Sequence, residues 1–79
     1  MKNPAINIAP RDTALRYIAM LSLIPVAPKD IGTTELRSLL ETQGFIVNPR
    51  TIQRDLNLLS TKFPLDTKPG IRNEMRWFF

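Results

Sequence analysis

The most regular pattern of hydrophobic and polar positions in the chain lies in residues 48–60. At 100° per residue, Ile52, Leu56 and Leu59 fall on one side of a helix built from this segment. Asn48 is a typical N-cap, and the proline that follows it suits the first helical position because no hydrogen bond is lost there. The pattern therefore predicts a short amphipathic helix. Its other side carries Arg50, Gln53, Arg54, Asn57 and Thr61.

A second amphipathic pattern covers residues 32–44, where three leucines fall on one side. Gly32 or Thr33 opens this predicted helix, and Gly44 closes it as the glycine after the C-cap. Only residues 44–47 separate the two helices, which is the arrangement of a helix-turn-helix. The inner leucines are Leu36, Leu39 and Leu40.

A further helix is predicted upstream, beginning within residues 10–12 and ending at Ile24, because Pro25 stops it. Residues 17–27 are apolar enough to suggest a signal peptide, but charged residues precede them and the run is short, so a core helix is the preferred interpretation. Residues 1–9 show no period and are predicted to be a flexible arm. The predicted inner side of this helix consists of Ala14, Leu15, Ile18, Leu21 and Ser22.

The last part of the chain changes from a helical to an extended pattern. Residues 63–67 and 75–79 are rich in strand formers and flank the turn-rich residues 68–73, which predicts a β-hairpin. Ile31 is a candidate for a further short strand before the second helix. Alternation along the hairpin places four hydrophobic residues or their neighbours over the helices: Phe63, Leu65, Trp77 and Phe79.

Together these elements predict an α+β fold, a three-helix winged helix-turn-helix with a C-terminal two-stranded β-hairpin wing. Residues 10–79 are expected to form this one domain. A single core in a chain of 79 residues leaves only about 3 to 5 kcal/mol of net stability, so a second folded unit does not fit.

The composition excludes most catalytic chemistry. The chain contains no cysteine and no histidine, and its 7 acidic residues are scattered without a glycine-rich phosphate loop. The sequence therefore predicts that the protein is not an enzyme and has neither a metal site nor a cofactor. The lack of cysteine also fits a reducing compartment such as the cytoplasm.

The positive charge is unevenly placed. The net charge is +4, and residues 48–79 hold six basic and three acidic residues, a surplus of three, whereas residues 1–47 contribute only one. The surplus coincides with the predicted outer helix side. A basic half favours nucleic acid as a partner, although it is also an ordinary solubility feature.

The polar side of residues 48–60 carries the side chains that recognise base edges in the major groove. Arginine pairs with guanine, glutamine and asparagine pair with adenine, and a threonine methyl contacts thymine. The alternative is an ordinary solvated helix surface. The predicted base-reading residues are Arg50, Thr51, Gln53, Arg54 and Asn57.

Other polar residues lie where contacts to the DNA backbone are expected, at helix starts and at the hairpin tip. The tip is expected to present Lys68 and Arg72, with a solvated loop as the alternative. Asp55 borders the apolar side of its helix and is expected to pair with an arginine such as Arg16 or Arg37. The predicted backbone contacts are Arg11, Lys29, Thr33, Thr34, Asn48, Lys68 and Arg72.

Residues 50–56, Arg-Thr-Ile-Gln-Arg-Asp-Leu, followed by Leu59 and Ser60, resemble the recognition helix of DeoR-like winged helix-turn-helix domains. The resemblance is closer still to the N-terminal domain of bacterial WYL-domain transcription regulators, and it extends over residues 11–79. It implies the DNA-binding domain of a bacterial or phage transcription regulator, with repression as the expected mode.

The same resemblance implies double-stranded DNA as the partner, with an inverted repeat as the operator and a homodimer as the functional form. The chain has no room for the sensor domain and dimerising elements of such regulators. The dimer contact is therefore expected in a segment beyond Phe79 or in exposed aromatic residues at positions 77–79, with no membrane contact. The alternative use of this fold is protein–protein assembly through the same outer side, without DNA reading.

Overall fold

The computed structural model describes residues 10–79, with side chains from Thr13 onward. The flexible arm predicted for residues 1–9 lies outside these residues. The described chain is an α+β fold with three helices and a three-stranded antiparallel sheet. In chain order the elements are α1 (Pro10–Leu23), β1 (Ile31–Gly32), α2 (Thr33–Thr42), α3 (Pro49–Ser60), β2 (Asp66–Pro69), the short 3₁₀ turn η1 (Ile71–Asn73) and β3 (Met75–Phe78).

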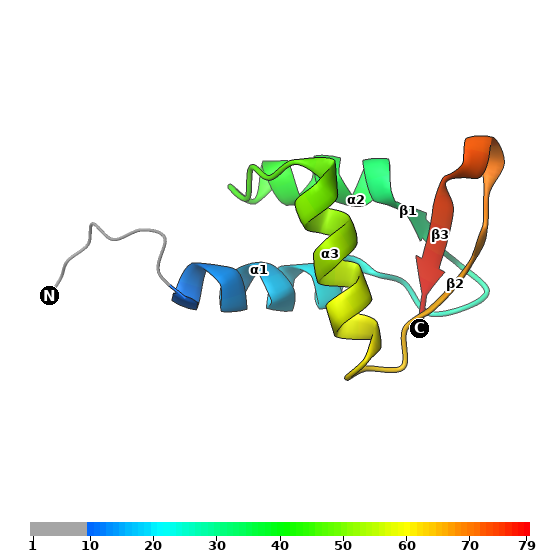
Figure 1. Ribbon diagram of the computed structural model, residues 1–79, viewed down its shortest axis with the longest axis horizontal. Helices are drawn as coiled ribbons and strands as arrows, with labels where there is room; N and C mark the ends of the chain where they lie inside the picture. The colour runs from blue at the N-terminus through cyan, green and yellow to red at the C-terminus, as the bar shows by residue number, and fades with distance from the viewer. Residues whose placement is uncertain (1–9) are drawn as a thin grey trace, which may run out of the picture.

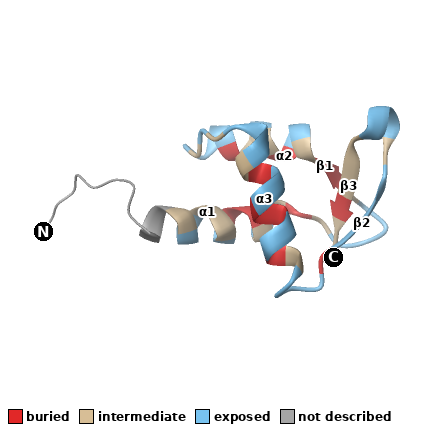
Figure 2. Ribbon diagram, in the orientation of Figure 1, coloured by how far each residue is buried: buried red, intermediate tan, exposed pale blue. Residues whose placement is uncertain are grey.

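Helices α1 and α2 lie side by side, α3 crosses them, and the sheet lies at one end of the helices (Figure 1). Buried positions line the side of α3 that faces the other helices and continue along α2 and the second half of α1 (Figure 2). The hydrophobic core therefore lies where the three helices meet. Its fully buried hydrophobic side chains are Met20, Leu36, Leu40, Ile52 and Leu56.

The two predicted helices of the central segment are confirmed, together with their ends. The side-chain oxygen of Asn48 accepts a hydrogen bond of 2.8 Å from the backbone N–H of Thr51, so Asn48 is the N-cap of α3. Gly44 follows the C-cap of α2 with a φ of +92°, which a residue with a side chain rarely adopts. The apolar sides of both helices face the core as predicted, with Leu39 half-buried and the others buried: Leu36, Leu40, Ile52, Leu56 and Leu59.

The predicted inner side of α1 is wrong. Leu15 is 52% exposed and Ile18 is 62% exposed, whereas Ala19, Met20 and Ile24 are buried. Apolar residues lie on both sides of this helix, so its hydrophobic pattern does not select one of them. Ala14 and Ser22 are also exposed, and Leu21 is half-buried.

The predicted two-stranded hairpin is part of a three-stranded sheet in the order β1-β3-β2. Ile31, correctly predicted as a strand residue, pairs with Trp77, and both side chains are buried. On the other edge of β3, β2 begins only at Asp66, so the segment from 63 to 65 lies outside the strand. For this reason Phe63 is 43% exposed and not packed over the helices, while Leu65 and Trp77 enter the core as predicted.

The aromatic residues at the C-terminal end are not the exposed surface that the sequence suggests. Trp77 is 4% exposed, and Phe78 and Phe79 are half-buried. The backbone N–H of Phe79 donates to the Pro25 carbonyl at 2.9 Å, and the N–H of Ala27 donates to the Phe79 carbonyl at 3.0 Å. The segment that follows α1 therefore pairs with the chain end and covers it.

Candidate nucleic-acid interface

The outer side of α3 carries the predicted base-reading side chains. Arg50, Gln53, Arg54 and Asn57 are exposed, and Thr51 is half-buried. One turn of helix separates Gln53 from Asn57, and the Gln53 Nε2 donates to the Asn57 Oδ1 at 3.1 Å. This bond leaves the Gln53 carbonyl oxygen and one N–H of its amide free, which is the acceptor and donor pair that adenine requires.

Asp55, the one acidic residue in α3, is removed from this outer side. Its side chain is 1% exposed, and the Arg16 Nε donates to its Oδ2 at 2.7 Å. The bond joins α1 to α3 and holds the Asp55 carboxylate inside the structure, away from the outer side of α3. As a result, the exposed side of α3 carries cationic and amide side chains and no carboxylate.

Arg37, the alternative partner expected for Asp55, has a different role. Its Nε donates to the Val47 carbonyl at 3.0 Å, which ties α2 to the segment that leads into α3. Sequence reasoning did not place Arg37 at the interface. The signal was present, however, because Arg37 lies three residues after Thr34 and so on the same side of α2.

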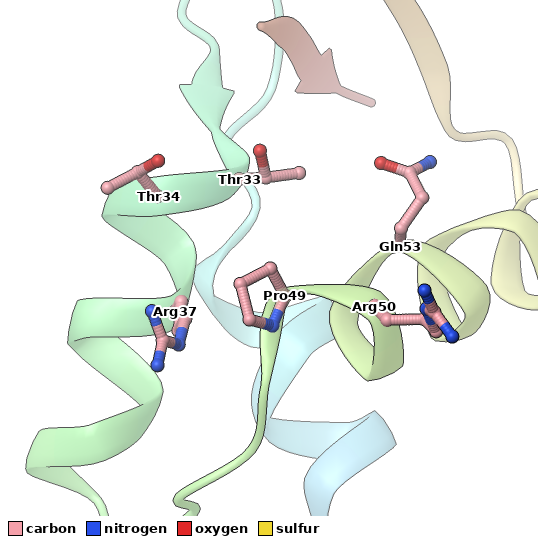
Figure 3. Close-up of a pocket in the computed structure, with 6 residues that line it drawn as sticks. All are labelled: Thr33, Thr34, Arg37, Pro49, Arg50 and Gln53. Atoms are coloured by element: carbon pink, nitrogen blue, oxygen red, sulfur yellow. The ribbon is translucent and has the colours of Figure 1, made fainter.

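A groove of about 400 Å³ separates the start of α2 from the start of α3. Figure 3 shows the six residues that line it, three on each helix. The groove brings two predicted backbone contacts of α2 next to two predicted base-reading residues of α3. The lining residues are Thr33, Thr34, Arg37, Pro49, Arg50 and Gln53.

Glu74, between η1 and β3, occupies the N-terminal end of α2. Its Oε2 accepts a bond of 2.7 Å from the Thr34 N–H and a bond of 3.1 Å from the Thr33 hydroxyl. The bond from the Thr34 N–H is the main cause that holds the pKa of Glu74 below its ordinary value. These two donors, which the sequence assigns to phosphates, are thus satisfied within the protein.

Lys68 does not lie at the hairpin tip, and this part of the prediction is wrong. It lies in β2 opposite Arg76, and its Nζ is 3.0 Å from the Asp30 Oδ2. Arg76 bonds the other oxygen of Asp30 at 2.9 Å. The hydrogen bond from Lys68, followed by that from Arg76, lowers the pKa of Asp30. The position of Lys68 in β2 therefore places its ammonium group beside an acidic partner, Asp30.

The other residues predicted to contact the DNA backbone lie in different parts of the structure. Arg72 is exposed at the tip, with a φ of +60°, and lines a second groove beside the start of α2. Lys29 is exposed but lines a third groove with Glu35, which lies on the opposite flank of α2 from Arg37. The Asn48 oxygen caps α3. The contact predicted for Arg11 lies outside the described side chains.

Comparison with protein-family models, curated proteins and solved structures finds no match to this chain. Within residues 10–79, no helix combines the length and apolar character needed to cross a membrane. The same residues contain no group of three or more acidic side chains that could hold a metal ion. The geometry of α2, α3 and the hairpin tip is therefore the basis for a functional proposal.

Proposed function

We propose that this protein binds double-stranded DNA in a sequence-specific manner as a winged helix-turn-helix domain, with α3 as the recognition helix. The observation that carries the proposal is the outer side of α3, where the donors Arg50, Gln53 and Arg54 are exposed and Asp55 is buried. A carboxylate on that side would repel DNA phosphates, and its burial leaves cationic and amide groups there that are suited to base edges.

In this proposal α3 enters the major groove of a duplex. Arg50 and Gln53 contact bases from the first two turns of the helix, while Asn57 orients the Gln53 amide through their 3.1 Å bond. Arg72, at the exposed hairpin tip, contacts a neighbouring phosphate or the minor groove. Binding takes place without a chemical step.

The resemblance of residues 50–56 to WYL-domain regulators supports a more specific role for the domain. We infer that it is the DNA-binding part of a bacterial or phage transcription regulator, and that it acts as a repressor in the cytoplasm. One recognition helix covers one half-site, so the functional form is expected to be a homodimer on an inverted repeat.

Selection from a pool of random duplexes, followed by sequencing, tests DNA reading directly. We expect the selection to enrich a defined half-site. Gln53→Ala should cost about 1 to 3 kcal/mol of binding free energy and relax the preference at one base position, and Arg50→Ala should do the same at another. Gln43→Ala is the matched control, because Gln43 is also an exposed glutamine but lies at the end of α2.

The salt dependence of the same binding reaction reports the contacts to the backbone. Four to six phosphate contacts imply a log–log slope of about −4 to −5 between binding constant and salt concentration. If the folded protein enriches no duplex, DNA binding is refuted and protein–protein assembly becomes the better explanation. If it enriches a half-site that Arg50→Ala and Gln53→Ala leave unchanged, α3 is not the reading helix.

A further inference from the structure

Among residues 10–79, three of the surface grooves that border α2 differ in charge. The groove between α2 and α3 is lined by Arg37 and Arg50 without an acidic residue. The groove beside the hairpin tip has two arginines and the carboxylate of Glu74. The groove on the opposite flank of α2 has one lysine and two acidic residues. Among these three grooves, the one between α2 and α3 alone has positive charge without an acid in its lining.

Arg37 is held in a fixed position within that groove. Its Nε donates to the Val47 carbonyl at 3.0 Å, and the side chain is half-buried. Among the described residues, its two terminal nitrogens have no hydrogen-bond partner. A guanidinium with one bonded edge and a free pair of terminal N–H groups suits a phosphate, which accepts two parallel hydrogen bonds.

Glu74 determines which donors of the α2 start remain available. Its carboxylate takes the Thr34 N–H and the Thr33 hydroxyl, so these two groups do not bind a phosphate while that contact persists. The Thr34 side chain also bonds this carboxylate, so it does not serve an anion either. In the groove between α2 and α3, Arg37 is therefore the donor of α2 that remains available to an anion.

We propose that Arg37 binds a backbone phosphate of the DNA strand that passes over the groove between α2 and α3. This inference rests on the proposed function and adds a contact to it. Arg37 fixes the register of α3 on the duplex, because Val47 connects it to the segment that starts the recognition helix. It carries no sequence preference of its own, since a phosphate is common to every base pair.

The first test compares the salt dependence of duplex binding for the wild-type protein and for Arg37→Gln. The substitution should weaken binding to every duplex about tenfold at low salt, as expected for loss of a charge-assisted bond. It should also reduce the log–log salt slope by about 1. Lys62→Gln is the matched control, because it removes the same charge from an exposed residue at the end of α3, outside all three grooves.

The slope separates a phosphate contact from a structural role. Loss of the bond to Val47 alone would weaken binding and leave the slope unchanged, and this outcome would overturn the proposal. Arg37→Lys should keep the slope, because it keeps the charge, while losing part of the affinity. Thermal melting identifies a folding defect in Arg37→Gln. If Arg37→Gln does not fold, Arg37→Lys replaces it as the test variant. An affinity of Arg37→Lys equal to that of the wild type would refute a bidentate contact.

Neutral phosphate analogues locate the contact on the DNA. A duplex with a single methylphosphonate at the contacted position should bind the wild-type protein about tenfold more weakly. The same replacement should leave binding by Arg37→Gln unchanged. If both proteins respond alike at every position, Arg37 does not contact a phosphate, although DNA binding itself stands. If the wild-type protein binds no duplex, the proposed function fails and this contact fails with it.

Discussion

Helices α1 and α3 are similar in length, with 14 and 12 residues, but they distribute their hydrophobic residues differently. In α3 the side opposite Ile52 and Leu56 is polar apart from Leu58, which is 46% exposed, so one rotation buries most of its hydrophobic residues. In α1 the two sides are both apolar. Ile18 lies about 200° from Met20 around the helix, yet Met20 is fully buried and Ile18 is largely exposed.

The rotation of α1 is explained by a contact outside the helix. Arg16 lies on the same side as Met20, and it bonds the buried carboxylate of Asp55. Turning α1 so that Ile18 entered the core would leave that carboxylate without its partner, which costs more than one exposed hydrophobic side chain. The comparison of α1 with α3 shows that a hydrophobic pattern selects one helix face only when the opposite face is largely polar.

The largest effect on stability is therefore expected from loss of the Arg16–Asp55 bond, which joins α1 to α3. Asp55→Ala should reduce the free energy of unfolding by about 3 to 5 kcal/mol, because Arg16 is left without a partner inside the structure. A domain of this size has about that much stability in total, so the variant should be largely unfolded. Denaturant titration followed by circular dichroism measures the change.

The control for this prediction replaces both partners by hydrophobic residues of similar size. Arg16→Met combined with Asp55→Leu should recover most of the stability, since no unpaired charge remains. An Asp55→Ala variant that melts like the wild type would show that the bond does not hold α1 against α3.

The next prediction separates the two sides of α1. Met20→Ala should cost about 2 to 5 kcal/mol of unfolding free energy, as should Leu56→Ala in α3, because both side chains are fully buried. Ile18→Ala should change stability by only about 0.5 kcal/mol, as is usual at exposed positions. Equilibrium unfolding of the three variants tests this order. A large loss of stability for Ile18→Ala with a small loss for Met20→Ala would show that the buried side of α1 is the one predicted from the sequence.

The smallest expected effect on stability concerns two carboxylates that lie outside α1 and α3. The pKa values of Glu74 and Asp30 are lowered in the folded protein by their hydrogen bonds to Thr34 and to Lys68 with Arg76. The stabilisation is therefore present above the ordinary carboxyl pKa values of about 4, and it is lost as the pH falls below them. Stability measured from pH 6 to pH 2 should decrease accordingly.

Glu74→Gln should flatten part of this acid dependence, because Gln keeps an acceptor for the Thr34 N–H but does not titrate. Glu35→Gln is the matched control, since Glu35 lies in the same first turn of α2 and takes no part in the bonds to Thr33 and Thr34. Equal flattening by both variants would indicate general charge repulsion, in place of the specific contact at the start of α2.

Local sequence determined much of the central segment. Asn48 and the proline after it define the start of α3, and Gly44 defines the end of α2, because caps act through neighbouring backbone groups. The buried side of α3 was predicted from its period, and Asp55 at the border of that side was expected to pair with an arginine, Arg16 or Arg37, of which Arg16 is the partner. The exposed donors of the candidate interface follow from that rotation.

Only the tertiary structure decided the side of α1, the third strand of the sheet, the pairing of Lys68 and the contact of Glu74 with α2. Each depends on residues far apart in the chain, with separations of 39 positions for Arg16–Asp55 and 40 for Thr34–Glu74. A helical or strand period describes only neighbours within a few residues. It therefore cannot select between two apolar sides, or between two partners for one charge, because that choice depends on which distant groups folding brings together.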